Sequence, residues 1–271
     1  HVAQLIHAAG LNAPQVLAQD AERGFLLLSD LGSQTMMQVI QQQAPLDPFP
    51  PAGSPIHQMY MDAVDALIAW QLSSRPGVLP AYDDALLSRE LQLFPDWYIA
   101  KHRGITVDAG LQDKLSGFFA QIKDSNLNSL GGARVFVHRD FMPRNLMAPT
   151  LGTRASSLPS SLGILDFQDA VYGPITYDIA SLMRDAFLSW DEEFVLDITV
   201  RYWQKARKAG LPVGDDFGEF LGVLPGAYAF LGNGDLAPEA GLHQPKYDFN
   251  DAAIAPGATL LAQAALLARG N

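Results

Sequence analysis

The sequence contains no cysteine, which excludes a disulfide framework, a thiolate zinc site, an iron–sulfur cluster and a cysteine nucleophile. Positive charge is scarce, because 18 lysines and arginines face 29 aspartates and glutamates and leave a formal net charge of −11. Such a chain repels nucleic-acid phosphates and anionic lipid headgroups. The absences argue against redox chemistry, nucleic-acid binding and membrane binding, and they are compatible with a reducing, cytoplasmic compartment.

Long apolar runs are also missing. The longest, at 260–268, is far shorter than the roughly 20 residues that a membrane helix needs. With 271 residues, 48% of them hydrophobic, the chain can bury a core without disulfide or metal staples. Because the first residue is His1 rather than Met, and a helical pattern begins at once, we expect that a segment upstream has been removed.

The apolar spacing divides the chain into a small strand-containing part and a larger helical part. Residues 1–32 are predicted to form a short helix, a β-hairpin and a hinge. A helix capped by Ser33 follows, and after it comes a proline-rich connector. Residues 33–220 read as the helical lobe, and residues 221–271, rich in Ala and Gly, as a divergent or frame-shifted tail. The predicted helices are 2–9, 34–42, 56–70, 86–101, 111–122, 179–188 and 194–206, and the predicted strands are 15–18, 25–28, 134–137, 146–148 and 163–165.

The strongest chemical signal follows one of these strands. His138-Arg139-Asp140 ends the run at 134–137, and Asn145 follows five residues after the aspartate, as in the H-R-D and Asn of kinase catalytic loops. Phosphoryl transfer needs a carboxylate that orients the acceptor hydroxyl and a neutral oxygen ligand for Mg²⁺. We therefore assign Asp140 as the base and Asn145 as a metal ligand. The alternative is that both residues only stabilise a turn.

A second carboxylate ends another apolar strand. Asp166 lies 26 residues after Asp140 and takes the place of the Asp in D-F-G, although the segment here reads D-F-Q-D. Because Mg²⁺ is usually held by one or two carboxylates together with phosphates, Asp166 is the predicted second metal ligand. Asp169 is either a further metal ligand or a turn-stabilising residue.

The segments 138–147 (H-R-D-F-M-P-R-N-L-M) and 164–182 (I-L-D-F-Q-D-A-V-Y-G-P-I-T-Y-D-I-A-S-L) resemble the aminoglycoside phosphotransferase and choline-kinase-like superfamily. Within it they are similar to the bacterial anomeric N-acetylmuramate/N-acetylglucosamine kinases of cell-wall recycling, a subgroup likeness that depends on R-E-L at 89–91 and Q-D-A-V-Y-G-P at 168–174. The resemblance covers about residues 1–220. It implies an α+β, protein-kinase-like bilobal fold with a truncated β-rich N-lobe and a large, mainly helical C-lobe.

The resemblance also implies where ATP binds. Ser29, Asp30 and Leu31 would form the hinge that reads the adenine edge, with an ordinary strand end as the alternative. Met147 would lie beneath the adenine, or else fill the core. Asp178 would brace the catalytic loop, although an N-cap role also accounts for it.

The basic and acceptor-side residues remain open at this stage. His138 is expected to pack and to hydrogen-bond backbone rather than act as a base. Arg139 and Arg144 are either loop braces or phosphate and substrate contacts. By resemblance Arg89, Glu90 and Trp97 are the candidates for the sugar site, and the alternative is a solvated charged face with a buried Trp.

The predicted function is ATP- and Mg²⁺-dependent phosphorylation of a sugar hydroxyl. The glycine-rich loop and strand lysine of the family are absent before residue 15 and are expected upstream of His1, so this chain should transfer phosphate poorly. The alternatives are a kinase for another small alcohol or aminoglycoside, and a catalytically silent kinase-fold binding protein. A metal-dependent hydrolase built on Asp140, Asp166 and Asp169 is the weakest reading. Residues 150–161, rich in Ser and Thr, are expected to form a surface hairpin.

Overall fold

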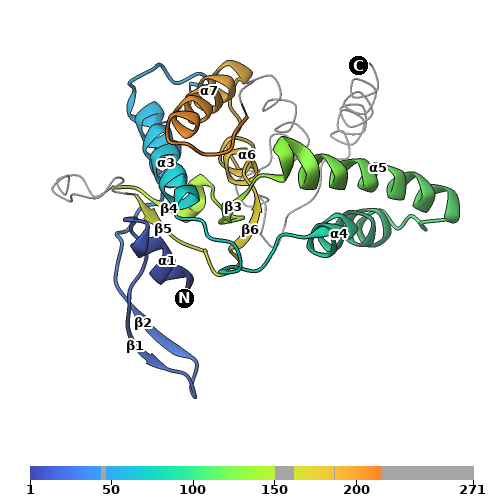
Figure 1. Ribbon diagram of the computed structural model, residues 1–271, viewed down its shortest axis with the longest axis horizontal. Helices are drawn as coiled ribbons and strands as arrows, with labels where there is room; N and C mark the ends of the chain where they lie inside the picture. The colour runs from blue at the N-terminus through green and yellow to red at the C-terminus, as the bar shows by residue number, and fades with distance from the viewer. Residues whose placement is uncertain (44–46, 150–161, 186, 215–271) are drawn as a thin grey trace.

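The computed structural model describes residues 1–43, 47–149, 162–185 and 187–214. The predicted tail at 221–271 and the predicted hairpin at 150–161 lie outside these residues. Helices and short sheets are mixed in the described part, as an α+β fold requires (Figure 1). The helices are α1 (Val2–Ala8), α2 (Met36–Gln41), α3 (Pro55–Leu72), α4 (Asp84–Leu93), α5 (Ala109–Asn128), α6 (Tyr177–Met183), α7 (Glu192–Lys208), the π-helix η1 (Phe94–His102) and the 3₁₀-helices η2 (Ser129–Gly132) and η3 (Pro143–Asn145).

The strands of the described residues form antiparallel couples. β1 (Val16–Asp20) pairs with β2 (Phe25–Leu28), which confirms the predicted hairpin, and Figure 1 shows that this hairpin projects away from the helical body. β3 (Arg134–Val137) pairs with β6 (Val171–Pro174), and β4 (Leu146–Met147) pairs with β5 (Gly163–Ile164). The sequence analysis missed β6, because its short run of Val-Tyr-Gly-Pro lacks the length and alternation of a recognisable strand.

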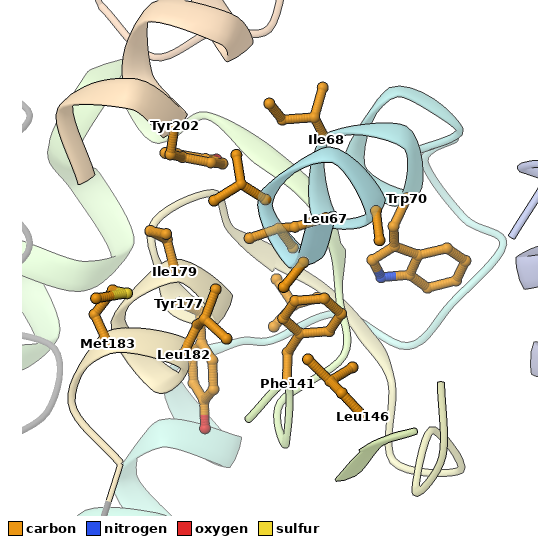
Figure 2. Packing of buried hydrophobic residues seen from close by; sticks show 14 of the residues in the cluster. Leu67, Ile68, Trp70, Phe141, Leu146, Tyr177, Ile179, Leu182, Met183 and Tyr202 are labelled. Atoms are coloured by element: carbon orange, nitrogen blue, oxygen red, sulfur yellow. The ribbon is translucent and has the colours of Figure 1, made fainter. Parts of the chain in front are cut away.

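The core is centred on α3, a helix with a broad apolar face. Leu67 and Trp70 of α3 lie with Ile179 of α6, Tyr202 of α7 and Phe141 of the loop after β3 in one packed cluster (Figure 2). All five side chains are buried to at least 98%. Full burial of such side chains stabilises a fold by roughly 1.5–3 kcal/mol each, so this cluster anchors the loop after β3 to the helical body.

The N-terminus of α2 differs from the prediction. The helix was expected to begin after Ser33, but Thr35 is the N-cap residue. Its hydroxyl accepts from the backbone N–H of Gln38 at 3.2 Å, and the Gln38 side chain accepts from the N–H of Thr35 at 2.8 Å. This reciprocal capping box pairs two N–H groups that the first turn would otherwise leave unpaired. Two plausible hydroxyl caps lie close together in the sequence, and the Gln three residues beyond Thr35 decides between them.

The single helix predicted at 86–101 is in fact two helices. α4 ends at Leu93, and η1 continues with i→i−5 hydrogen bonds such as Arg103 N–H to Tyr98 O at 2.9 Å. Pro95 has no N–H to donate to Leu91, so the α-helical ladder is interrupted there. The wider π-helical turn that follows changes the direction of the side chains after residue 94.

The helix predicted at 179–188 is displaced and shorter. α6 covers Tyr177–Met183, and Asp185 then accepts hydrogen bonds from the backbone N–H groups of Phe187 (2.5 Å) and Leu188 (2.8 Å). Such an Asx turn competes with helix continuation. Asp178 therefore lies inside α6, and the N-cap position belongs to Thr176, so the N-cap reading of Asp178 was wrong.

Among the described residues, no helix combines the length and the apolar character that a membrane crossing demands.

Candidate active site

The catalytic-loop segment folds back on itself directly after β3. Pairing of β3 with β6 fixes the start of this segment. The carbonyl of Asp140 accepts from the Met142 N–H at 3.0 Å and from the Asn145 side-chain amide at 2.9 Å. The Asn145 N–H in turn donates to Met142 O at 2.8 Å. These bonds hold Asp140 and Asn145, five residues apart, against each other.

The second predicted metal residue joins the same loop. The Leu165 N–H donates to Asn145 O at 2.9 Å, which brings the end of β5 onto the catalytic loop. The Asn145 amide nitrogen lies 3.3 Å from Asp166 Oδ2, and Gln168 donates to Asp166 Oδ1 at 2.8 Å. Asp166 has a φ of +61°, which few non-glycine residues adopt. Asp140, Asn145 and Asp166, predicted separately from two motifs, therefore meet at one place.

These residues fit a magnesium ion by their chemistry. Because the Asn145 amide nitrogen donates twice, its Oδ1 is the atom left for a cation, next to the Asp166 carboxylate. One carboxylate and one amide oxygen, completed by phosphate and water oxygens, is a usual protein share of a Mg²⁺ shell. The part of the chain that the structure describes gathers no group of three or more His, Cys, Asp or Glu side chains suited to a metal.

Asp178 holds the loop after β3 by hydrogen bonds to its backbone. It is fully buried, and its two carboxylate oxygens accept from the backbone N–H of His138 at 2.7 Å and of Arg139 at 3.0 Å. Burial raises the pKa of Asp178 to about 7, against the two N–H donors, which lower it. The bracing role is what the resemblance implied for this residue.

His138 is a packed residue and not an exposed base. Its side chain is buried, and Nε2 lies 2.9 Å from Leu165 O. Burial lowers the pKa of His138 to about 4, so the ring is neutral near pH 7. This agrees with the expectation that the ring hydrogen-bonds backbone.

Asp140 is the carboxylate whose surroundings suit proton chemistry. It is half-buried, and burial first, then the nearby Asp166 carboxylate, raise its pKa above the ordinary value. A base with a raised pKa accepts a proton more readily than an exposed aspartate does.

The residues predicted for the sugar site have different surroundings in the structure. Glu90 of α4 forms an ion pair with Arg139 and accepts a hydrogen bond from Tyr82 Oη at 2.6 Å, which places it beside the catalytic loop. Trp97 of η1 is 58% exposed, with Lys101 Nζ 3.6 Å from its ring centroid, so the expectation of a buried Trp was wrong. Arg89 is exposed on α4. No sequence signal pointed to Tyr82, which sequence reasoning missed.

Arg144 turns toward the segment after α6. Its guanidinium carbon lies 4.8 Å from the centroid of the Phe187 ring. Burial raises the pKa of the buried Asp185, and the charge of Arg144 is among the effects that lower it. Arg144 is exposed. The structure therefore places it at the edge of the loop, apart from the pair of Arg139 and Glu90.

Of the hinge candidates, Leu31 lies against the β4–β5 pair. Ser29 Oγ accepts from the Gln15 N–H at 2.9 Å, and Asp30 Oδ1 accepts from the Gly32 N–H at 2.9 Å. A Cβ added to Gly163 would lie 2.8 Å from Leu31 Cδ1 and 3.0 Å from Met147 Cβ. Because residue 163 is a glycine, Leu31 and Met147 can both lie this close to its backbone. Two residues that were predicted to contact the nucleotide are thus neighbours.

A cleft of about 430 Å³ lies beside η1, apart from the predicted catalytic and metal residues. Gln92 and Asp96, which are hydrogen-bonded to each other at 2.9 Å, form one wall. The other lining residues are Pro95, Ala100, Gly104, Ile105, Thr106, Val107 and Gln112.

Comparison with known sequences agrees with this geometry. The sequence model of the family described as "Phosphotransferase enzyme family" matches residues 1–231. An N-acetylmuramate/N-acetylglucosamine kinase of Pseudomonas aeruginosa is 48% identical over 221 residues, which are 81% of this chain and 58% of that protein. A kinase of the same name from Neisseria meningitidis is 44% identical over 212 residues, or 78% of this chain and 57% of that protein. The chain thus spans less than three fifths of the length of these curated relatives.

Comparison with solved structures bears on the fold. A choline kinase from Cryptosporidium parvum superposes with a TM-score of 0.51 at 12% identity and covers 99% of this chain and 78% of that one. At so low an identity the likeness concerns the fold alone, and it confirms the predicted kinase-like α+β architecture.

Proposed function

Because the chain belongs to the phosphotransferase enzyme family, we propose that it transfers the terminal phosphoryl group of ATP to a sugar hydroxyl, the anomeric hydroxyl of N-acetylmuramate or N-acetylglucosamine. The observation that carries the proposal is the meeting of Asp140, Asn145 and Asp166 in one hydrogen-bonded loop. The amino-sugar part of the proposal is supported by the names of the relatives.

Asp140 acts as the base in this proposal. Its carboxylate accepts the proton of the attacking hydroxyl and orients the oxygen toward the phosphoryl group. The raised pKa of Asp140 suits this task. Asn145 and Asp166 hold Mg²⁺ through one amide and one carboxylate oxygen. When bound, Mg²⁺ neutralises charge that develops on the nucleotide phosphates.

The nucleotide and acceptor ends follow from the neighbouring elements. Ser29, Asp30 and Leu31 offer backbone groups to the adenine edge, and Met147, adjacent to Leu31 across Gly163, packs against the ring. Arg89 and Trp97 remain the acceptor candidates on α4 and η1, with Trp97 offering an exposed aromatic face to a pyranose. Arg144 is a candidate contact for phosphate or substrate at the edge of the loop. Use of ATP and the absence of cysteine favour a cytoplasmic location.

A cationic acceptor is the second candidate. Asp166, Asp169 and Glu90 all contribute to the raised pKa of Asp140, so the site is locally acidic, and the formal charge of the chain is −11. An acidic site attracts an amine-bearing alcohol or an aminoglycoside. A substrate panel separates this candidate from the amino sugars.

The deciding experiment is a phosphate-transfer assay with the full-length gene product, Mg²⁺–ATP and a panel of amino sugars, neutral sugars and aminoglycosides. We expect turnover with N-acetylmuramate and N-acetylglucosamine. Asp140→Asn should lower kcat about 10²- to 10⁴-fold, since the proton acceptor is lost, and leave ATP affinity nearly unchanged. The control is Asp113→Asn, an exposed aspartate of α5.

Two outcomes would contradict the proposal. Turnover retained by Asp140→Asn would refute the role of Asp140. Binding of Mg²⁺–ATP without transfer to any acceptor would support a catalytically silent binding protein instead.

A further inference from the structure

Arg139, the residue before the proposed base, has a strained backbone. Its φ is +79°, a region in which glycine is at ease and a long side chain is disfavoured. The backbone is held there by its neighbours, because the Arg139 N–H donates to Asp178 Oδ1 at 3.0 Å and Arg139 O accepts from Ser181 Oγ at 3.4 Å. A strained residue persists where surrounding contacts over-determine it, and such residues cluster at functional sites.

The side chain gives the reason for an arginine at this position. The guanidinium pairs with the Glu90 carboxylate through Nη2 and Oε1, and Nη1 lies 3.5 Å from the carbonyl of Asp169. The two paired side chains are only 22% and 23% exposed, so water screens the ion pair less than at the surface. A glycine would remove the strain and would leave Glu90 without this partner.

Glu90 is also held from the other side. Its Oε2 accepts from Tyr82 Oη at 2.6 Å, and the backbone N–H of Tyr82 donates to Tyr172 O at 2.9 Å on β6. A Cβ on Gly173 would lie 2.7 Å from Tyr82 Cβ, so only a glycine allows Tyr82 to lie this close to β6. Arg139, Glu90, Tyr82 and Gly173 form a continuous bridge, which joins the R-E-L, H-R-D and V-Y-G-P segments in space.

We infer that Arg139 and Glu90 are positioning residues, whose ion pair, fixed by Tyr82 against Gly173, aligns the acceptor helix α4 with the loop that carries Asp140. The inference rests on the proposed function. Both carboxylate oxygens of Glu90 have protein partners, one on the loop and one on Tyr82, which suits a role in holding the loop in place. Misplacement of a reacting group by about 1 Å can cost roughly 10²-fold in rate, so breaking the bridge should impair transfer while sparing the nucleotide.

The test uses Glu90→Gln, Arg139→Gly, their double variant and the conservative Arg139→Lys, each in the full-length gene product. Glycine adopts a φ of +79° readily, so Arg139→Gly removes the guanidinium without adding backbone strain. We expect kcat/KM for the acceptor to fall about 10- to 100-fold in each of the first two variants, with the KM for ATP unchanged within about twofold. The double variant should lose no more than the worse single variant, because both substitutions break one unit. Arg139→Lys should recover part of the loss.

Two further variants serve as an independent test and as a control. Tyr82→Phe removes only the hydroxyl that holds Glu90 and should give a smaller loss of the same kind, even if Arg139→Gly fails to fold. Glu192→Gln breaks a more exposed ion pair, that of Arg184 and Glu192 between the end of α6 and the start of α7, and should leave all constants unchanged.

The results separate the inference from the proposed function. Three outcomes would overturn the inference alone, given a wild type that is active. The variants could be as active as the wild type, the losses could multiply in the double variant, or the KM for ATP could rise as much as the KM for the acceptor. A wild type that transfers phosphate to no acceptor would overturn the proposed function, and the inference with it.

Discussion

Asp140 and Asp178 show how two aspartates of one site acquire different tasks. Asp178 is fully buried under two backbone N–H donors, so it holds the loop and has no access to a substrate. Asp140 is half-buried beside Asp166, and its side chain keeps an accessible face. The environment of each carboxylate, and not its residue type, distinguishes the buried brace Asp178 from the proposed base Asp140.

The metal role of Asp166 can be tested by its effect on each ligand separately. Asp166→Ala removes the carboxylate of the proposed Mg²⁺ site. We expect Mg²⁺-dependent binding of ATP to be lost, while binding of the acceptor sugar is retained. Isothermal titration calorimetry with each ligand, with Gln168→Ala as the control for the loss of one neighbouring hydrogen bond, checks this. Unchanged affinity for Mg²⁺–ATP would refute the assignment.

The buried His138 makes stability depend on pH. Its pKa is about 4 in the folded chain and ~6.5 when unfolded, so between these values the unfolded chain binds more protons. His138 therefore contributes stability above pH ~6.5, and that contribution is lost as the pH falls toward ~4. As the pH falls from ~6.5 to ~4, the free energy of unfolding of the wild type minus that of His138→Gln should therefore decrease.

Urea titrations of both proteins at a series of pH values measure that difference. Asp178, which titrates with the opposite sign, is common to both and cancels to first order. A difference that stays constant between pH 4 and 6.5 would mean that His138 titrates normally in the folded state.

At the scale of elements, the short pieces around the site depend on their neighbours. α2 has six residues, too few to be stable alone, yet it is tied to the catalytic region because Ala148 N–H donates to Gln34 O at 2.9 Å and Thr35 forms a bridge with Met147. Its N-terminal cap therefore supports the strand that carries Met147.

Removal of that cap should destabilise the protein measurably. Thr35→Ala deletes the side-chain half of the capping box and should lower the free energy of unfolding by about 1 kcal/mol. Ser33→Ala is the matched control, since Ser33 lies before the helix and is not its cap. Chemical denaturation of both variants provides the measurement. A larger loss of stability in Ser33→Ala than in Thr35→Ala would show that Ser33, the cap predicted from the sequence, is the N-cap of α2.

At the scale of the whole molecule, the β1–β2 hairpin is a described segment with many exposed apolar side chains. Its six large apolar side chains are between 44% and 67% exposed, in contrast to the buried core around α3. An antiparallel pair with apolar faces and unpaired edges can template association with another strand. The exposed residues are Val16, Leu17, Phe25, Leu26, Leu27 and Leu28.

This exposure predicts self-association of the chain. Sedimentation velocity should show concentration-dependent association, and the double substitution Phe25→Lys with Leu27→Glu should reduce it, because charges at a strand edge oppose pairing. The control is Leu196→Glu, at a comparably exposed apolar residue of α7. Equal behaviour of the two variants would show that the hairpin is not the associating surface.

Local pattern determined a large part of this protein. The hairpin and the positions of most helices follow from spacing over a few residues, and so does the choice of Asp140, Asn145 and Asp166 as proposed site residues, because strand periodicity and the H-R-D and D-F segments are local properties. The packed, backbone-bonded His138 was predicted for the same reason, since apolar residues precede it directly.

Tertiary structure decided what local pattern could not. Asp178 lies within α6 because that helix begins at Tyr177, whereas the Thr35 cap and the break at Pro95 are local features that apolar spacing alone does not reveal. The bridge from Arg139 to Glu90 joins residues 49 apart and needs Tyr82 and β6 to form. Nothing in the sequence near Glu90 specifies a partner so distant, because such contacts arise only when the core of α3, α6 and α7 brings the segments together.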